Sequence, residues 1–374
     1  MNARLNPTAM PVPDSSAEGA ARARQQQLTK PPGSLGRLEE LACWFAARLS
    51  NPTPQLLRSE VFVFAADHGV AARGVSAFPQ SVTAQMLGNF ANGGAAINVL
   101  ASLHECRIEV VDVGVAGNPD LPKGIRNERV RAGTRDLFAE AAMTDDELAA
   151  ALSVGKRCAG EAIQRGAQLL IAGDMGIANT TAAACLICAF TNAPPEQVVG
   201  RGTGVDDNGL ARKREVVAAA LARTRAAIGI AQAVDTAQAE NVQLQSGTDM
   251  TRTARQLFAH LGGLEIAAMA GLYMEAARNG IPVLLDGYIS GAAALAAVRL
   301  EPGTLPWMLA SHLSAESGHR FALKALGLDP LLDLGMRLGE GSGAALTLPI
   351  IKAALSLHRN MATFSQAGVD GATT

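Results

Sequence analysis

The stretch Val61-Phe-Val-Phe-Ala-Ala-Asp-His-Gly69 decides the fold. Its first six residues are apolar without alternation, and the run stops at a polar cluster that ends in glycine. Continuous apolar runs of this length are typical of strands that are buried on both faces, as in parallel sheets. The spacing of apolar residues over 82–100 is helical instead, with an interruption at Asn92-Gly93-Gly94. The stretch therefore predicts a buried strand followed by a helix.

The same alternation repeats along the chain. Further apolar runs lie at 108–113, 169–172, 282–285 and 307–310, and helical patterns lie at 145–165, 178–190, 262–278 and 290–298. Alternating strands and helices predict an α/β fold in which a parallel sheet carries helices on its faces. Each run ends in polar or glycine residues, and ligands bind at the carboxyl ends of strands in open α/β sheets. We therefore expect a ligand pocket at that edge.

Composition excludes several classes of protein. A chain of 374 residues suits two domains, or one large domain with an appendage. The net charge of −2 gives no basic surface for nucleic acid or an anionic membrane. No secretory signal is evident, and the six histidines show no metal-ligand spacing. The sequence predicts a cytoplasmic protein with no metal, no nucleic-acid partner and no membrane partner.

Asp67 and His68 could form an acid–base pair at the end of the first strand. Neighbouring residues on a strand point to opposite faces, so both enter one pocket only if the strand has already ended. The alternative, in which Asp67 anchors a loop and His68 hydrogen-bonds locally, is equally open.

The loop Gly173-Asp-Met-Gly-Ile-Ala-Asn-Thr-Thr181 resembles a phosphate site. It follows a strand and opens a helix, and the N–H groups at a helix N-terminus bind anions. Gly176 would let the backbone approach the ligand, while Asn179 and Thr180 would add donors. Asp174 would repel a phosphate, so we expect it to face a ribose or a base, or to support the loop.

Other candidate ligand contacts could equally be residues with an ordinary structural role. Lys213 is a candidate phosphate contact or part of a solvated basic turn, and Ser314 heads a second turn that could cradle an anion. Phe78 could lie against a flat ring whose polar edge Gln80 would contact, or it could act as a hydrophobic staple.

One further stretch, Asp333-Leu-Gly-Met-Arg-Leu-Gly-Glu-Gly-Ser-Gly-Ala-Ala-Leu346, carries a carboxylate between glycines. The helix expected after it would place Glu340 beside a helix N-terminus, which predicts a lowered pKa and an ionised side chain. Such a group could take a proton, bind a cation or cap the helix. Arg337 is a candidate ligand contact or a structural salt bridge.

Together these stretches resemble the nicotinate-nucleotide–dimethylbenzimidazole phosphoribosyltransferase family, from about residue 28 to 360. The motifs that carry the resemblance are Lys30-Pro-Pro-Gly-Ser-Leu-Gly-Arg-Leu38, Ala66-Asp-His-Gly-Val70, Asp112-Val-Gly114, Gly176-Ile-Ala-Asn-Thr-Thr181, Pro282-Val-Leu-Leu-Asp-Gly287, Ser311-His-Leu-Ser-Ala-Glu316 and Arg337-Leu-Gly-Glu-Gly-Ser-Gly-Ala-Ala-Leu346.

The resemblance implies a reaction and a fold. The reaction transfers 5-phosphoribose from nicotinate mononucleotide to 5,6-dimethylbenzimidazole, with inversion, and gives α-ribazole 5′-phosphate and nicotinate for cobalamin assembly. No cofactor is implied, and the family forms homodimers. The fold is a Rossmann-like, mostly parallel sheet with a small helical domain built from both chain ends. We expect an N-terminal helical segment at 1–58, a large α/β domain at 59–305 and a C-terminal segment at 306–374.

The resemblance also implies roles for residues. Glu340 would be the catalytic base. Asp174 stands where the family carries a glutamate, and it is the chemistry of the reaction, not the resemblance, that suggests a role for Asp174 in easing positive charge in the transition state. For the phosphate the resemblance implies Gly176, Asn179 and Thr180, with Lys213 and Ser314 as further candidates. The other predicted substrate-binding residues are Arg337, Leu338, Phe78, Gln80 and Met86, and the loop that holds the last three is variable in the family. Residues 224–256 look additional to the family. A phosphoribosyl enzyme acting on another base, or a non-catalytic nucleotide-binding module, remain the alternatives.

Overall fold

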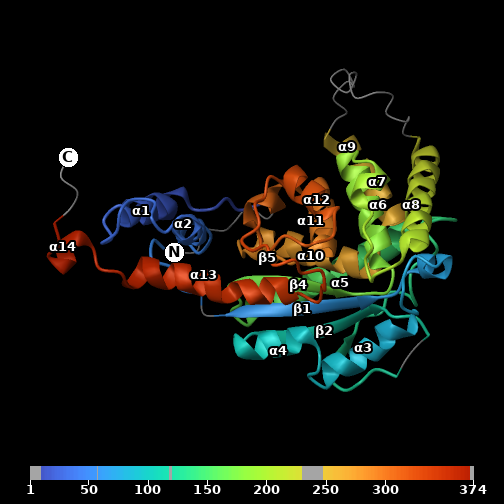
Figure 1. The fold of residues 1–374 in the computed structure, drawn as a ribbon, viewed down its shortest axis with the longest axis horizontal. Helices are drawn as coiled ribbons and strands as arrows, with labels where there is room; N and C mark the ends of the chain where they lie inside the picture. The colour runs from blue at the N-terminus through green and yellow to red at the C-terminus, as the bar shows by residue number, and fades with distance from the viewer. Residues whose placement is uncertain (1–9, 57, 118–119, 230–246, 371–374) are drawn as a thin grey trace.

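The computed structural model describes residues 10–56, 58–117, 120–229 and 247–370 (Figure 1). Its centre is a six-stranded sheet with the order β3-β2-β1-β4-β5-β6, and every pair is parallel. The strands are β1 (Ser59–Ala66), β2 (Arg107–Gly114), β3 (Ile125–Asn127), β4 (Leu169–Met175), β5 (Val283–Leu285) and β6 (Met308–Ala310). This is the Rossmann strand order. Strands β1 to β3 are added toward one edge of the sheet and β4 to β6 toward the other, so the order of the strands reverses between β1 and β4. The predicted fold class is confirmed.

Helices connect the strands and continue beyond them. They are α1 (Ser15–Gln25), α2 (Arg37–Arg48), η1 (Gly69–Arg73), α3 (Ser81–Ala91), α4 (Ala96–Leu103), α5 (Asp145–Gln164), α6 (Asn179–Thr191), α7 (Pro195–Val198), α8 (Asp207–Ile228), α9 (Gly247–Leu261), α10 (Leu264–Arg278), α11 (Tyr288–Leu300), η3 (Pro302–Trp307), α12 (His319–Leu326), α13 (Ser342–Asn360) and α14 (Phe364–Ala367). None of the helices in the described ranges combines the length and apolarity that a membrane span requires.

Both faces of the sheet are covered, as the unbroken apolar run of β1 predicts. Phe62 and Phe64 point to one face and join a core formed with α5, α6, α10 and α11. Val61 and Val63 point to the other face and join a second core formed with α2, α3, α4 and α13. Successive side chains of a strand alternate between faces, so each core takes every second residue.

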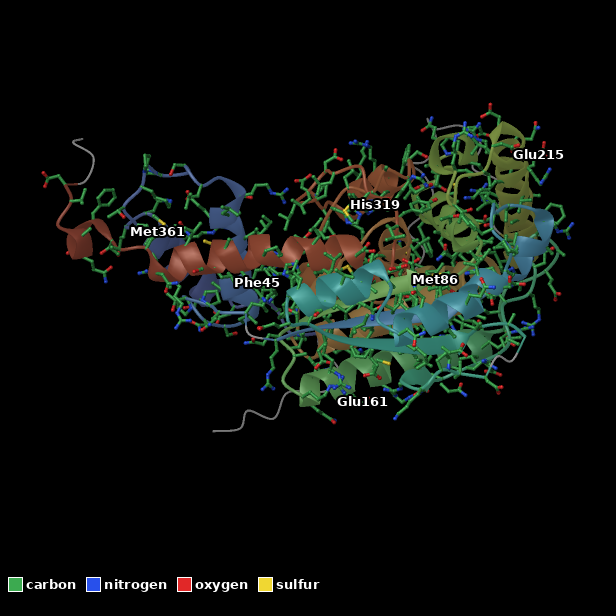
Figure 2. All side chains as sticks on the ribbon, turned by 60° about the horizontal axis from the view of Figure 1, so that its bottom comes forward. Phe45, Met86, Glu161, Glu215, His319 and Met361 are labelled. Carbon is green, nitrogen blue, oxygen red and sulfur yellow. The ribbon has the colours of Figure 1, made fainter. Side chains whose placement is uncertain are left out.

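A small helical unit combines the two ends of the chain. Helices α1, α2 and α14 lie at one end of the molecule, and α13 runs to them from the sheet (Figure 1). Figure 2 places Phe45 of α2 and Met361, which follows α13, at this same end. The Gln25 amide nitrogen lies 2.9 Å from Nδ1 of His358. Both chain ends therefore build the unit. The domain bounds stay a prediction, and the chain beyond 305 still contributes β6 to the sheet.

The structure adds detail to the predicted elements at three places. The predicted helix 82–100 is two helices, α3 and α4, because Gly93 takes a left-handed φ of 76° and the Asn98 side chain accepts the N–H of Ala95. Strand β3 was missed because it has only three residues. In the segment 224–256, α8 and α9 occupy the two ends, and residues 230–246 lie outside the described part.

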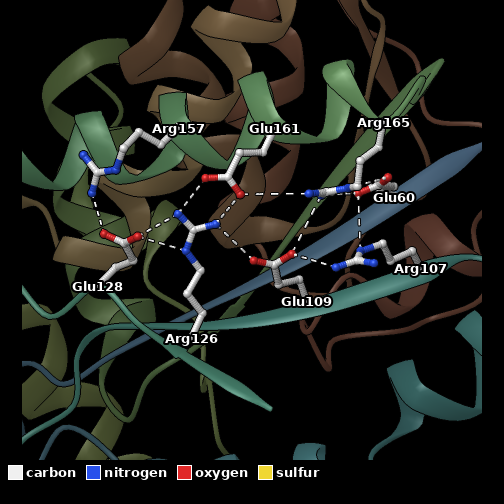
Figure 3. A network of polar contacts seen from close by, with 8 residues as sticks. All are labelled: Glu60, Arg107, Glu109, Arg126, Glu128, Arg157, Glu161 and Arg165. Atoms are coloured by element: carbon white, nitrogen blue, oxygen red, sulfur yellow. Dashed lines mark hydrogen bonds and ion pairs between the residues drawn. The ribbon is translucent and has the colours of Figure 1, made fainter.

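A network of ion pairs ties α5 to the edge of the sheet (Figure 3). Arg126 of β3 stands at its centre and contacts Glu161 of α5 at 2.6 Å, Glu128 at 2.7 Å and Glu109 of β2 at 3.2 Å. The network extends to Glu60, Arg107, Arg157 and Arg165. Arg126 thus bridges three carboxylates that would otherwise repel one another.

We expect Arg126→Met to lower the free energy of unfolding by roughly 1–2 kcal/mol, a fall in Tm of about 2–5 °C. The Arg126 side chain is 21% exposed, and the loss of its guanidinium leaves three neighbouring carboxylates without their shared counter-ion. Thermal unfolding followed by circular dichroism at low salt and in 1 M NaCl measures the effect, which should shrink in salt. Arg157→Met is the matched control, because Arg157 is 51% exposed at the rim of the same network. Equal losses for the two variants would contradict the central role of Arg126.

Candidate active site

A pocket of about 390 Å³ lies where β4, β5 and β6 end, next to the reversal of strand order. Its walls come from α3 and the loop before it, from the segments after these three strands, from the loop before α8 and from the turn before α13. The lining residues are Phe78, Val82, Met86, Asp174, Met175, Gly176, Ile177, Asn179, Thr180, Gly202, Thr203, Gly287, Tyr288, Ile289, His312, Ser314, Glu316, Arg337, Leu338, Gly339 and Glu340. The pocket occupies the position in which ligands bind to open α/β sheets.

Glu340 sits on a turn with unusual backbone geometry. Its φ is +63°, between Gly339 at +89° and Gly341 at +85°. A left-handed φ at a residue other than glycine persists only where its surroundings hold it. Gly173 of β4 makes room for the turn, since a Cβ there would stand 2.1 Å from the carbonyl carbon of Glu340. The Glu340 N–H donates to the carbonyl oxygen of Asp174 at 3.2 Å. The turn is therefore clamped against the end of β4.

The Glu340 side chain is buried, with 5% of the residue exposed, and its Oε2 has no hydrogen-bond partner. Burial raises the pKa of Glu340; the nearby N–H of Ile97, in the first turn of α4, opposes this shift, and the charge of Asp286 adds to it. The expectation of a lowered pKa is wrong, because desolvation outweighs the effect of the helix end. A carboxylate with a raised pKa is better suited to accept a proton near neutral pH.

Asp174 lies beside Glu340 in a group of buried carboxylates. Burial raises the pKa of Asp174 well above its ordinary value, and the charges of Asp286, Glu265 and Glu340 raise it further. The Asn179 amide donates to Asp174 Oδ2 at 2.8 Å and opposes the shift. Asn179 thus lines the pocket with its amide already engaged. A cation bound here would favour the ionised form of these carboxylates.

Another part of the lining is formed by Gly176, which precedes α6, by Thr180 in its first turn and by Ser314. The Ser314 N–H donates to Nδ1 of His319 at 2.9 Å, which fixes the backbone of that turn. The start of α6 carries no side-chain cap, as the predicted anion site requires.

Lys213 does not line the pocket but lies directly behind Thr180. Its Nζ donates to Thr180 Oγ1 at 2.8 Å and to the Gly200 carbonyl at 3.3 Å. Only 1% of the residue is exposed, so the alternative of a solvated basic turn is wrong. Burial lowers the pKa of Lys213 to about 8, while Glu316 opposes the shift.

The pocket mouth carries apolar side chains. Phe78 and Leu338 line it and are 53% and 57% exposed, and Met86 lies deeper on α3. Arg337 lines the mouth and donates to the Gly202 carbonyl at 2.9 Å. Gln80 does not line the pocket, because its amide donates to the carbonyl of His68 at 3.3 Å.

Asp67 and His68 have separate partners, and neither lines the pocket. Asp67 accepts from the Thr83 hydroxyl at 2.7 Å and from the Ala116 N–H at 2.8 Å. His68 Nε2 lies 2.7 Å from a carboxylate oxygen of Glu265, and both side chains are buried. The geometry favours the anchoring role over an acid–base pair.

Sequence reasoning assigned no role to Asp286, His312, Glu316 or Tyr288. Asp286 lies beneath the Glu340 turn, and the other three line the pocket. The available signal was their position after apolar runs, since Asp286 and Tyr288 follow β5 and His312 follows β6. Among the described residues, no group of three or more His, Cys, Asp or Glu is arranged to hold a metal ion.

Comparison with known proteins identifies the family. A family model described as "Phosphoribosyltransferase" matches residues 10–369. The chain is 56% identical over 359 residues to a nicotinate-nucleotide–dimethylbenzimidazole phosphoribosyltransferase of Chromobacterium violaceum, covering 96% of this chain and 97% of that protein. It is 47% identical over 361 residues to the protein of that name from Xanthomonas campestris pv. campestris strain B100, with 96% and 97% covered.

A solved structure supports the same assignment. The crystal structure of a nicotinate-nucleotide–dimethylbenzimidazole phosphoribosyltransferase from Thermus thermophilus is similar, with a TM-score of 0.84 and 47% identity. The match covers 96% of this chain and 100% of that chain. The chain belongs to the nicotinate-nucleotide–dimethylbenzimidazole phosphoribosyltransferase family.

Proposed function

We propose that the chain transfers 5-phosphoribose from nicotinate mononucleotide to 5,6-dimethylbenzimidazole and releases α-ribazole 5′-phosphate and nicotinate, a step in assembling the nucleotide loop of cobalamin. The observation that carries the proposal is Glu340, a buried carboxylate whose free oxygen has no partner, held by a strained turn in the pocket. The names of the relatives supply the donor and acceptor.

In this reaction Glu340 acts as the general base. The ring nitrogen of dimethylbenzimidazole that carries hydrogen must lose its proton when the other ring nitrogen attacks the anomeric carbon. The raised pKa of Glu340 moves the carboxylate toward the range in which a base works best at neutral pH. The pyridinium nitrogen of the donor leaves as a neutral ring, so the departing group needs no acid.

Attack from the face opposite nicotinate inverts the anomeric carbon and turns a β-riboside into an α-riboside. Positive charge develops on the ribose as the bond to nicotinate breaks. Asp174 has Asp286, Glu265 and Glu340 as neighbouring carboxylates, which raise its pKa; positive charge on the ribose favours the ionised form of Asp174 and is stabilised by it. Asp174 therefore has an electrostatic role in the proposal, and Asn179 holds its carboxylate.

The phosphate of the donor binds between Gly176, Thr180 and Ser314. The Thr180 N–H and hydroxyl supply donors, whereas the N–H groups of Asn179 and Thr181 already donate to the carbonyls of Gly176 and Ala178. Lys213 acts from behind this wall, through its hydrogen bond to Thr180. The acceptor base occupies the apolar side, against Phe78, Met86 and Leu338, with Arg337 at the rim.

We also propose a homodimer. Val99 and Leu103 lie one turn apart on α4 and are 62% and 69% exposed, and Ile350 on α13 is 37% exposed. Exposed apolar side chains on neighbouring helices are typical of subunit contacts. Light scattering after gel filtration tests this, and a monomer at micromolar concentration would contradict it.

The reaction is tested by incubating the purified chain with nicotinate mononucleotide and dimethylbenzimidazole and identifying products by mass. Nicotinate and α-ribazole phosphate are the expected products, and NMR of the anomeric proton reports the inversion. If nicotinate mononucleotide reacts with adenine or a phenol but not with dimethylbenzimidazole, the proposed acceptor is wrong and the other compound takes its place. Donor binding without turnover would indicate a nucleotide-binding module instead.

A further inference from the structure

Asp286 holds the turn that carries Glu340. This residue follows β5 and is 1% exposed. Its Oδ2 accepts the N–H of Gly341 at 3.1 Å, and its Oδ1 accepts the N–H of Ala344 at 2.9 Å. Gly341 directly follows Glu340, and both N–H groups belong to the start of α13, where a carboxylate is favoured. Asp286 thus ties the base turn to the end of a different strand.

Asp286 is itself held in place from several sides. Its N–H donates to Ser290 Oγ at 3.0 Å, and the Tyr273 hydroxyl lies 2.7 Å from that same oxygen. Ser311 Oγ donates to the Asp286 carbonyl at 3.3 Å. Residues of α10, of α11 and of the segment after β6 therefore fix its position. Such packed support is what an accurately placed catalytic group requires.

The titratable groups around Asp286 come from every element packed against it. His312, after β6, has its Nδ1 4.0 Å from Asp286 Oδ1. Asp174 on β4, Glu340 before α13 and Tyr273 on α10 each respond to the Asp286 charge, which raises the pKa of all three. Glu265 of α10 acts on Asp174 and pairs with His68. Asp286 is therefore coupled electrostatically to the base.

We propose that Asp286 is a positioning residue for Glu340, whose carboxylate fixes the left-handed turn and so aims the base at the acceptor nitrogen. The inference rests on the proposed function of the pocket. Asp286 does not line the pocket, so it acts through Glu340 rather than on substrate. A base displaced by about 1 Å loses on the order of 100-fold in rate.

Asp286→Asn tests the proposal, because the amide keeps the shape but turns one acceptor into a donor facing a backbone N–H. We expect kcat to fall on the order of 100-fold with little change in donor KM. The acid limb of kcat against pH should also move to lower pH, since one of the charges that raise the pKa of Glu340 is lost. Asp333→Asn, the same change on an exposed residue of the loop before Glu340, should match the wild type.

A double-variant cycle separates positioning from a general loss of structure. In a Glu340→Gln background, adding Asp286→Asn should lower kcat less than about twofold, because the group it positions is already gone. A further 100-fold loss, or an Asp286→Asn enzyme that behaves like Asp333→Asn, would overturn the proposal.

Two further outcomes must be distinguished, a variant that does not fold and a wild-type enzyme that lacks the proposed activity. If Asp286→Asn does not fold, Ser290→Ala replaces it, and this milder variant should show a smaller loss of kcat with the same lack of additivity with Glu340→Gln. Additive losses for Ser290→Ala would again overturn the proposal. If the wild-type enzyme itself gives no α-ribazole phosphate, the proposed function fails, and that result is independent of any variant.

Discussion

Glu340→Gln is expected to lower kcat by roughly 10²–10⁴-fold, the usual contribution of a positioned general base. The amide has the same shape as the carboxylate, but at neutral pH it cannot take up the proton that dimethylbenzimidazole must lose. Donor affinity should change little, because the proposed phosphate contacts come from Gly176, Thr180 and Ser314 and not from Glu340. Steady-state turnover and direct titration of nicotinate mononucleotide measure the two effects separately.

Glu105→Gln is the matched control for this variant. Glu105 is also a glutamate with a left-handed φ, +56°, but it is exposed on the turn after α4. We expect wild-type turnover from it. Full activity of Glu340→Gln at saturating substrate would remove Glu340 from the role of base.

The pH dependence provides a second check on the same group. The pKa of Glu340 is raised by burial, so the carboxylate is ionised only above that raised value. The kcat/KM of the wild-type enzyme should therefore fall as the pH drops through a value above the ordinary range of a glutamate, and Glu340→Gln should lack this limb. A pH profile that is flat down to about pH 4.5 in the wild type would contradict the assignment.

The fold could be predicted because apolar runs and helical patterns alternate several times along the chain, and each can be recognised from a short stretch of sequence. Each of the five apolar runs overlaps a strand, and burial on both faces follows from the lack of alternation in Val61–Ala66. The short edge strand β3 could not be predicted, because three residues carry no periodicity. The break between α3 and α4 lies at the interruption Asn92-Gly93-Gly94, which the sequence shows, but the contact of the Asn98 side chain with the Ala95 N–H could not be predicted from the helical pattern.

The sequence could predict many of the residues of the candidate site, but not how deeply each of them is buried. Strand ends and glycine turns marked Glu340, Asp174 and the start of α6, and the structure brings these together in one pocket. The sign of the Glu340 pKa shift could not be predicted, because burial depends on packing among β4, α4 and α13. For the same reason the sequence did not show that Lys213 stands behind Thr180 rather than in the pocket.

Lys213→Met is expected to lower kcat/KM for nicotinate mononucleotide by about 10–100-fold, the factor that corresponds to a charged hydrogen bond of roughly 1.5–3 kcal/mol. The ammonium donates to the Thr180 hydroxyl and places a buried positive charge behind the proposed phosphate wall. Methionine fills the same space without charge, so the loss reports the electrostatic contribution. Arg212→Met, on the neighbouring exposed residue of α8, should leave kcat/KM unchanged.

The pH profile separates this charge from packing at the same position. Burial lowers the pKa of Lys213 to about 8, so the protonated form that attracts phosphate is present below that pH and is lost as the pH rises through it. Because kcat/KM reports the groups of the free enzyme, it should fall above about pH 8 in the wild type. Lys213→Met should lack this alkaline limb and stay uniformly low. An alkaline limb that survives in Lys213→Met belongs to another group, and Lys213 would then contribute packing alone.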